Sequence, residues 1–265
     1  MGKTSPLLIA QLSDLHLFAT PDRDLLGLNT FSSLEIILQE LQGLPIKPDQ
    51  LLLTGDLAQD ETDVAYQQIQ QLIAPLQIPT YWLPGNHDHL PTMQGVFTDP
   101  SFRSHKSYRM GDWHFLLLDS SVSGKVYGEL SADSLNWLDQ ELERCHPHPT
   151  LIALHHPPFA IKSDWLDRIG LQNSDDLFAI VDRYSHVKLV IFGHIHQQFE
   201  HQRGEVYYLS TPSTCIQFAP HSKTFALDPA QPGFRLLRLY DNGMFETEVQ
   251  RVMLSQPLDF SAKGY

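Results

Sequence analysis

The chain has 265 residues, enough for one large domain, and its 42% hydrophobic share is typical of a globular protein with a full core. Its net charge of −13 argues against a nucleic-acid-binding or anionic-membrane-binding surface, since both ligands are bound mainly through Lys and Arg. No apolar run approaches the roughly 20 residues that span a bilayer. We therefore expect a single cytoplasmic domain over residues 1–265, monomeric or homodimeric, with no membrane or nucleic-acid partner.

Six short apolar runs recur along the chain, and each ends in polar residues. Runs of about four to six apolar residues bounded by Gly and Pro predict strands that are buried on both faces. The predicted strands are Leu7–Leu12, Leu51–Leu53, Tyr81–Leu83, Phe115–Leu118, Leu151–Leu154 and Val187–Phe192.

Helical patterns lie between these runs. Thr30 or Ser32 can cap a first helix whose apolar face carries Leu34, Ile37 and Leu41. Further helices are predicted over Glu61–Ile73, Ser131–Arg144 and Ser174–Tyr184. The alternation of strands and helices predicts an α/β fold.

The C-terminal part has a different pattern. Two apolar segments, Phe234–Tyr240 and Met244–Val252, flank an Asn-Gly pair. Asn-Gly between two strand-like segments is typical of a β-hairpin turn. We therefore predict a hairpin at about residues 234–252 and a sheet that is mixed instead of purely parallel.

Five of the six predicted strands are followed by residues of types that commonly bind metals. These are Asp14 and His16, Asp56, Asn86 with His87 and Asp88, His155 with His156, and His194 with His196. Because ligands collect at the carboxyl ends of strands in open α/β sheets, we expect these side chains to lie together. Mixed imidazole and carboxylate ligation suits iron, manganese and zinc better than magnesium or calcium.

Each of these motifs has an ordinary structural interpretation when taken alone. Gly55-Asp56 is typical of a turn, and Asp14 can cap a strand end. His156 is interpreted either as a group that orients His155 or as a packed histidine, and Asp88 as an acceptor for ligand histidines or backbone. The order, strand context and ligand type of the motifs agree, however, and together they predict one metal site.

The series Asp-x-His, Gly-Asp, Gly-Asn-His-Asp, His-His-Pro-Pro and Gly-His-x-His, between residues 14 and 196, resembles the calcineurin-like metallophosphoesterase superfamily. That resemblance implies a four-layer α/β/β/α sandwich of mixed sheets. A closer similarity is to the bacterial class III 3′,5′-cyclic AMP phosphodiesterases. It rests on the segments Leu25–Thr30, Thr54–Asp60, Trp82–Asp88 and Thr211–Cys215.

Two metal ions are implied by the resemblance. The first would be bound by Asp14, His16, Asp56 and His196. The second would share Asp56 as a bridge and add Asn86, His155 and His194. Iron and manganese are favoured, with zinc, cobalt and magnesium as alternatives.

The resemblance also implies substrate contacts. His87 would stay off the metals as the catalytic residue and bind the scissile phosphate or the leaving oxygen. Asn86 and His196 would face the substrate as well. The segments 22–29 and 211–221, the latter with Thr211 and His221, are candidates to border the nucleotide.

These expectations predict a phosphodiesterase that cleaves 3′,5′-cyclic AMP to 5′-AMP through a metal-bridging hydroxide. Two divalent ions, the carboxylates of Asp14 and Asp56 and the hydroxide leave a site charge of about +1, which suits a singly charged phosphodiester. One alternative is a phosphodiesterase or phosphomonoesterase of broader specificity. A more remote alternative is a non-catalytic scaffold with the same fold.

Overall fold

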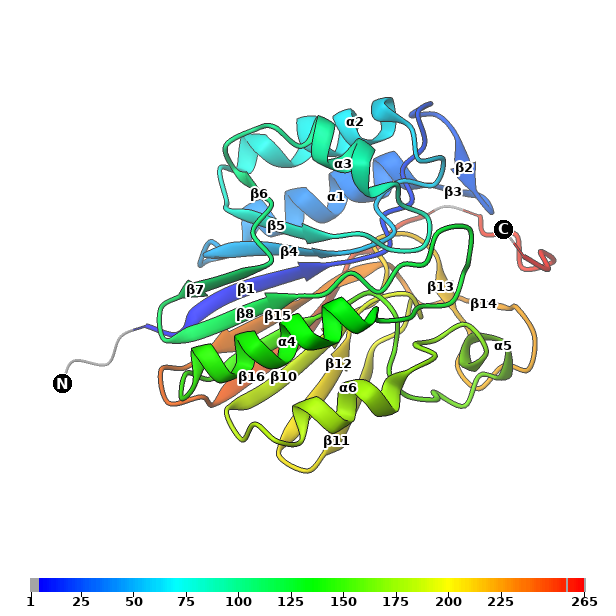
Figure 1. The fold of residues 1–265 in the computed structure, drawn as a ribbon. Helices are drawn as coiled ribbons and strands as arrows, with labels where there is room; N and C mark the ends of the chain where they lie inside the picture. Colours follow the sequence, from blue (N-terminus) through cyan, green and yellow to red (C-terminus); the bar gives the residue numbers. More distant parts are fainter. Residues whose placement is uncertain (1–4, 256, 265) are drawn as a thin grey trace.

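The computed structural model describes residues 5–255 and 257–264. Two six-stranded sheets are stacked face to face, and helices cover the outer face of each (Figure 1). This arrangement confirms the predicted α/β/β/α sandwich of mixed sheets. Residues 1–4, 256 and 265 of the expected single domain lie outside the described residues.

The first sheet has the strand order β16-β15-β1-β4-β5-β6. Its strands are β1 (Leu7–Leu12), β4 (Gln50–Thr54), β5 (Thr80–Leu83), β6 (Phe102–Arg103), β15 (Gly233–Leu239) and β16 (Phe245–Arg251). The strands β1, β4, β5 and β6 run parallel. The two C-terminal strands pair antiparallel with each other, and β15 pairs antiparallel with β1.

The second sheet has the order β11-β12-β10-β9-β8-β7. Its strands are β7 (Ser107–Met110), β8 (Trp113–Leu117), β9 (Thr150–Ala153), β10 (Val187–Phe192), β11 (Phe199–Arg203) and β12 (Val206–Ser210). The four inner strands run parallel, and both edge strands are antiparallel. Two short hairpins complete the strands: β2 (Asp24–Leu25) with β3 (Leu28–Asn29), and β13 (Gln217–Phe218) with β14 (Leu227–Asp228).

The central strands are mainly apolar because both of their faces are covered. In β1, Ala10 and Leu12 pack into the core beneath the helices, whereas Ile9 packs into the core between the sheets. In β9, Ile152 packs towards the helices and Leu151 towards the other sheet. Successive side chains of a strand point to opposite faces, so a strand in the middle of four layers buries apolar residues on both faces.

Helices cover the outer faces of the two sheets (Figure 1). The helices are α1 (Thr30–Gly43), α2 (Asp63–Ile73) and α3 (Leu90–Val96) on the first sheet, α4 (Ala132–Cys145) and α6 (Ser174–Val181) on the second, the short α5 (Asp164–Asp167), and a 3₁₀ turn at Ala74–Leu76. None of these helices is long and apolar enough to cross a bilayer, within the part of the chain that the structure describes.

Three predicted helix ends were wrong. Asn29, and neither Thr30 nor Ser32, caps α1, because its side-chain oxygen accepts a hydrogen bond from the backbone N–H of Ser32. Thr62 caps α2 in the same way, so that helix begins at Asp63 and not at Glu61. The helix predicted over Ser174–Tyr184 is α6, which ends earlier, at Val181.

The parallel strands bring their carboxyl ends to one side of the molecule, the right side in Figure 1. A buried glutamine ties the two sheets together there. Gln11, at the end of β1, donates from Nε2 to Thr54 Oγ1 at 3.1 Å and to the carbonyl oxygen of Phe192 at 3.0 Å. Since Phe192 ends β10 in the second sheet, this side chain holds strand ends of both sheets in one place.

Candidate metal centre

The candidate metal ligands share an unusual backbone conformation. Five non-glycine residues on these loops have φ between 48° and 70°, in the left-handed region. They are Asp14, His16, Asp56, His194 and His196. Side chains other than glycine rarely adopt this conformation, and clusters of such residues are characteristic of functional sites.

Hydrogen bonds join the loops on which these residues lie. The backbone N–H of Asp14 donates to Gly55 O at 2.9 Å, and that of His16 to Asp56 O at 3.0 Å. Across the sheet interface, the backbone N–H of His194 donates to Asp14 Oδ1 at 3.0 Å. The left-handed turns are therefore stabilised by contacts between loops that are distant in sequence.

The loop after β10 approaches the loop after β1 so closely that only glycine fits at residue 193. A Cβ atom there would lie 2.0 Å from Ser13 Oγ and 2.9 Å from Asp14 Oδ2. Gly193→Ala should therefore lower the free energy of unfolding by roughly 1–3 kcal/mol through overpacking and also weaken metal binding. Urea unfolding and metal analysis would measure the two effects.

Gly95→Ala is the matched control for that substitution. A Cβ atom at Gly95, in α3, would meet nothing within 4 Å, and helical Ala is favoured over Gly. The control should keep or slightly raise stability. If Gly193→Ala and Gly95→Ala had the same stability and metal content, the loops after β1 and β10 would have room to separate.

Asp14, His16 and His196 form the first group of candidate ligands, and all three are fully buried. Nε2 of His16 lies 3.2 Å from Nε2 of His196, which lies 3.5 Å from Asp14 Oδ1. The opposite ring nitrogens are held by oxygen acceptors: His16 Nδ1 by Gln59 Oε1 at 2.6 Å, and His196 Nδ1 by Ile216 O at 2.8 Å.

These contacts determine which ring nitrogens carry protons. A carbonyl oxygen can only accept, so Nδ1 of His16 and of His196 must donate. In the neutral rings both Nε2 atoms then present lone pairs, and two lone pairs at 3.2 Å repel each other unless a cation lies between them. The first group therefore fits a metal ion, with the Nδ1 contacts orienting the rings as they do in metal sites.

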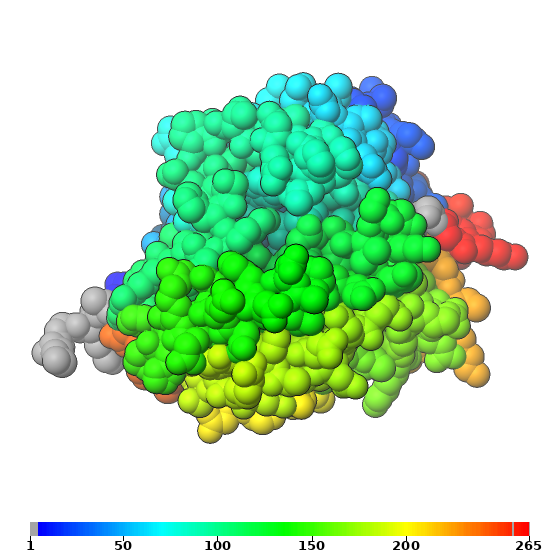
Figure 2. Space-filling model, viewed as in Figure 1, coloured from blue at the N-terminus to red at the C-terminus, as the bar shows by residue number. Residues whose placement is uncertain are grey.

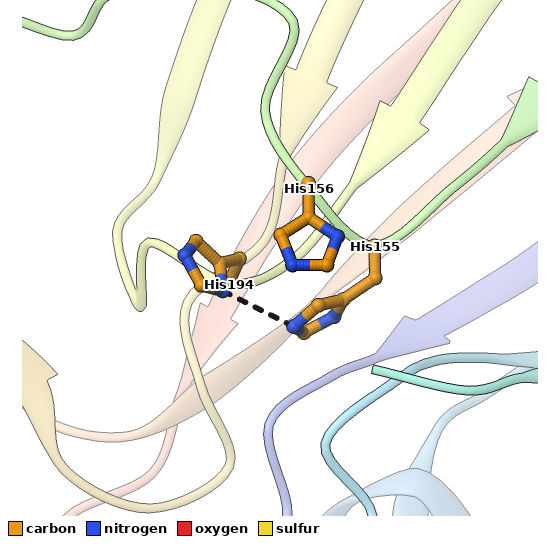
Figure 3. A group of neighbouring side chains, drawn as sticks. All are labelled: His155, His156 and His194. Carbon is orange, nitrogen blue, oxygen red and sulfur yellow. Dashed lines mark hydrogen bonds between the residues drawn. The ribbon is translucent and has the colours of Figure 1, made fainter. Parts of the chain in front are cut away.

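His155, His194 and Asn86 form the second group. His155 Nδ1 donates to the carbonyl oxygen of Thr54 at 2.8 Å, which leaves Nε2 to face His194 Nδ1 at 3.3 Å (Figure 3). Oδ1 of Asn86 is buried and has no hydrogen-bond partner among the described residues. A buried amide oxygen without a donor costs free energy, and a metal ion would remove that cost.

His156 lies beside these rings in Figure 3, but its ring nitrogens are already engaged. Nε2 donates to Val126 O at 3.1 Å, and Nδ1 lies 2.8 Å from Ser120 Oγ. A neutral imidazole has one donor and one acceptor, and both are used here. His156 is thus a packed histidine, and the Thr54 carbonyl orients His155 in its place.

Asp56 lies between the two groups. Its Oδ2 is 3.2 Å from His155 Nε2 and 3.9 Å from His16 Nε2. Its Oδ1 accepts the backbone N–H of His87 at 2.8 Å. One carboxylate therefore reaches histidines of both groups, which is the position that a bridging ligand requires.

The buried carboxylates are balanced by the histidines around them. Burial alone would raise the pKa of Asp56, but His155 and His87 outweigh it and hold that pKa well below its ordinary value. Burial likewise lowers the pKa of His155, yet Asp56 raises it to about 9. The pKa of His16 falls to about 3 because burial disfavours its charged form. The centre thus demands positive charge, which a metal ion would supply in place of the proton on His155.

His87 lies at the edge of the candidate metal centre. Its ring packs edge-on against His16, with ring centroids 5.0 Å apart. His87, Asn86 and His194 line a cavity of about 290 Å³ that adjoins the two groups. Donor atoms of His16, Asp56 and His87 lie within 4.8 Å of one another, so geometry alone also permits His87 as a ligand.

Two further residues of the predicted site lie elsewhere. Thr211 is buried directly after β12, and His221 is exposed in a turn. Neither is among the described residues that line the cavity beside His87. Phe218, from the same predicted segment, does line it.

Two residues outside the proposed ligand set support the site, and the sequence analysis gave a role only to Asp88. Gln59 orients His16 and could have been noticed from its place in the Gly-Asp-Leu-Ala-Gln segment. Asp88 accepts hydrogen bonds from the backbone N–H groups of Leu57 and Gly85, at 3.0 and 2.9 Å, and from the Tyr66 hydroxyl. It thereby joins the loops after β4 and β5, as the backbone alternative for Asp88 predicted.

A four-layer sandwich with Asp, Asn and His gathered at the adjoining strand ends defines a metallophosphoesterase. Residues 7–198 match the model of the calcineurin-like phosphoesterase family. The chain belongs to that family, which confirms the resemblance seen in the motifs.

Relatives match the chain over nearly its whole length. A Nostoc protein named 3′,5′-cyclic-nucleotide phosphodiesterase is 48% identical and covers 98% of this chain and 97% of its own. The Escherichia coli K12 3′,5′-cyclic adenosine monophosphate phosphodiesterase CpdA is 40% identical, covering 97% and 94%.

Solved structures show the same fold at low sequence identity. A dimetal phosphatase from Danio rerio has a TM-score of 0.64 at 15% identity and covers 90% of this chain and 94% of its own. A purple acid phosphatase from yellow lupin has a TM-score of 0.67 at 15% identity and covers 94% and 52%.

Proposed function

We propose that this protein hydrolyses 3′,5′-cyclic AMP to 5′-AMP at a centre of two metal ions. The observation that carries the proposal is the shared carboxylate Asp56 between two groups of buried histidines, in a chain 40–48% identical to proteins named as cyclic-nucleotide phosphodiesterases. Cyclic AMP is the proposed small-molecule partner. We propose a cytoplasmic single-domain protein, monomeric or homodimeric.

The proposed ligands follow from the two groups. Asp14, His16 and His196 hold one ion, Asn86, His155 and His194 hold the other, and Asp56 contacts both. Mixed nitrogen and oxygen donors favour iron or manganese. Two such ions, when bound, would lower the pKa of the attacking water and stabilise charge on the phosphoryl oxygens.

His87 is the proposed proton donor. Its backbone N–H is fixed on Asp56 Oδ1, which holds the residue at the cavity wall beside the candidate ligands. From there a protonated imidazole can transfer a proton to the departing 3′ oxygen of the substrate. Asn86 and His196 are proposed to contact the phosphodiester as well.

Asn86→Ala separates the roles of two adjacent residues. The variant should lose metal from the second group only, because the buried Oδ1 is the atom that lacks a partner. We expect about one ion per chain instead of two, together with a large loss of activity. Metal analysis of the purified variant checks this, and full metal content would show that Asn86 is not a ligand.

A substrate panel tests the function directly. It compares 3′,5′-cyclic AMP, cyclic GMP, 2′,3′-cyclic AMP, bis(4-nitrophenyl) phosphate and 5′-AMP. We expect cyclic AMP to be opened to 5′-AMP, with 5′-AMP itself a poor substrate. Faster release of phosphate from 5′-AMP would indicate a nucleotidase-like enzyme. Similar rates on all diesters would favour the broader alternative, and no hydrolysis at all would favour the scaffold.

A further inference from the structure

The C-terminal tail, residues 257–264, is attached to the small β2–β3 hairpin. The backbone N–H of Asp259 donates to Leu26 O at 2.9 Å. Gly27 has φ +90°, and a Cβ atom there would lie 2.1 Å from Pro257 O. The hairpin glycine is thus required by the close passage of the tail, which accounts for the Leu-Leu-Gly-Leu-Asn segment that the metal centre does not use.

The end of this tail reaches the candidate metal centre. Lys263 and Gly264 line the same cavity of about 290 Å³ as Asn86, His87 and His194. In the space-filling view the tail, in red, lies between the blue residues of the N-terminal part and the orange residues near 225 (Figure 2). Lys263 is the only Lys or Arg among the described residues that line the cavity. The protein as a whole has a net charge of −13.

Aromatic side chains form another part of the cavity wall. The rings of Trp165, Phe218 and Phe225 contact one another, with centroids 5.0 to 5.5 Å apart. Phe218 is stacked on the candidate ligand His196, with centroids 4.0 Å apart. The indole N–H of Trp165 is buried without a hydrogen-bond partner among the described residues. Such a wall suits a flat heteroaromatic base, which stacks on aromatic rings.

We propose that the C-terminal tail, held by the β2–β3 hairpin, completes the nucleotide-binding cavity over the metal centre. The base lies against Trp165, Phe218 and Phe225, and Lys263 supplies positive charge for the phosphodiester at the mouth of the cavity. This inference rests on the proposed function, since it takes a cyclic nucleotide as the ligand. The tail binds substrate and takes no part in bond cleavage.

Ending the chain at Ser255 tests the proposal. The KM for cyclic AMP should rise about tenfold or more, because the shortened chain lacks Lys263 and the segment that closes the cavity, while kcat changes less than about twofold. Metal content should be unchanged, because no candidate ligand is removed. Bis(4-nitrophenyl) phosphate keeps the charged phosphodiester but lacks the nucleoside that the tail encloses, so the rise in its KM should be smaller.

Two pairs of single substitutions test the parts. Lys263→Gln should raise the KM for cyclic AMP and weaken the dependence of KM on ionic strength. The control is Lys47→Gln, which makes the same charge change on an exposed loop. It should leave both the KM and its dependence on ionic strength unchanged. Gly27→Ala should displace the tail and raise KM. Gly204→Ala, also at positive φ but with nothing within 4 Å, should not.

Opposite results have clear meanings. A truncated chain with the wild-type KM for cyclic AMP would overturn the proposal. A parallel fall in kcat on both substrates, with loss of metal, would also overturn it by making the tail a support of the metal centre. Failure of the proposed function itself is distinct: the wild-type protein would then cleave the aryl diester and leave cyclic AMP intact.

Discussion

Asp56→Asn should lower kcat/KM for cyclic AMP by several orders of magnitude. The side chain reaches histidines of both candidate groups, His155 at 3.2 Å and His16 at 3.9 Å, so its charge acts on both proposed ions. Asn is nearly the same size but carries no charge, and it therefore weakens both sites without creating a cavity. No other single substitution in the centre is expected to affect both ions equally.

Metal analysis and steady-state kinetics on the same preparation check this result. Asp112→Asn is the matched control, because Asp112 is half-exposed, pairs with Arg109 on the surface and should tolerate the change. Full metal content with normal turnover in Asp56→Asn would contradict the bridging role. Loss of one ion alone would assign Asp56 to a single group.

His87→Ala should keep both metal ions and lower kcat by roughly 10²–10⁴-fold, the range expected for a general acid. The loss should shrink as the pKa of the leaving group falls, because good leaving groups depart without a proton. A series of aryl phosphodiesters with graded leaving groups measures this dependence. The variant should show a steeper dependence of rate on leaving-group pKa than the wild-type protein.

His89→Ala is the control for that experiment. His89 is exposed in the same loop, where its ring hydrogen-bonds Thr92, and it does not line the cavity beside Asn86 and His194. An equal loss across all leaving groups in His87→Ala would indicate that His87 positions the phosphate. Loss of a metal ion would make His87 a ligand, which the short distances to His16 and Asp56 also permit.

The strands and the residues that follow them could be predicted because their signals are local. A strand in the middle of four layers carries apolar residues on both faces, and all six predicted runs form strands. Each run ends where a polar loop begins, so candidate ligands such as Asp14 and His194 could be recognised from their place after a strand. The cap of α1 could not be predicted in this way, because Asn29, Thr30 and Ser32 are all cap-type residues and only backbone geometry distinguishes them.

By itself, the sequence determined the fold class, the family and the chemistry available at the strand ends. Only the tertiary structure decided how these groups meet. It distributed the predicted strands over two sheets, and it placed Asp56 between the two groups of candidate ligands. It also showed that the carbonyl oxygens of Thr54 and Ile216 orient two histidines, although a backbone group has no signature in the sequence. The contact of the tail with Gly27 was hidden for a related reason: it joins residues more than 200 positions apart, and no local pattern encodes such a pairing.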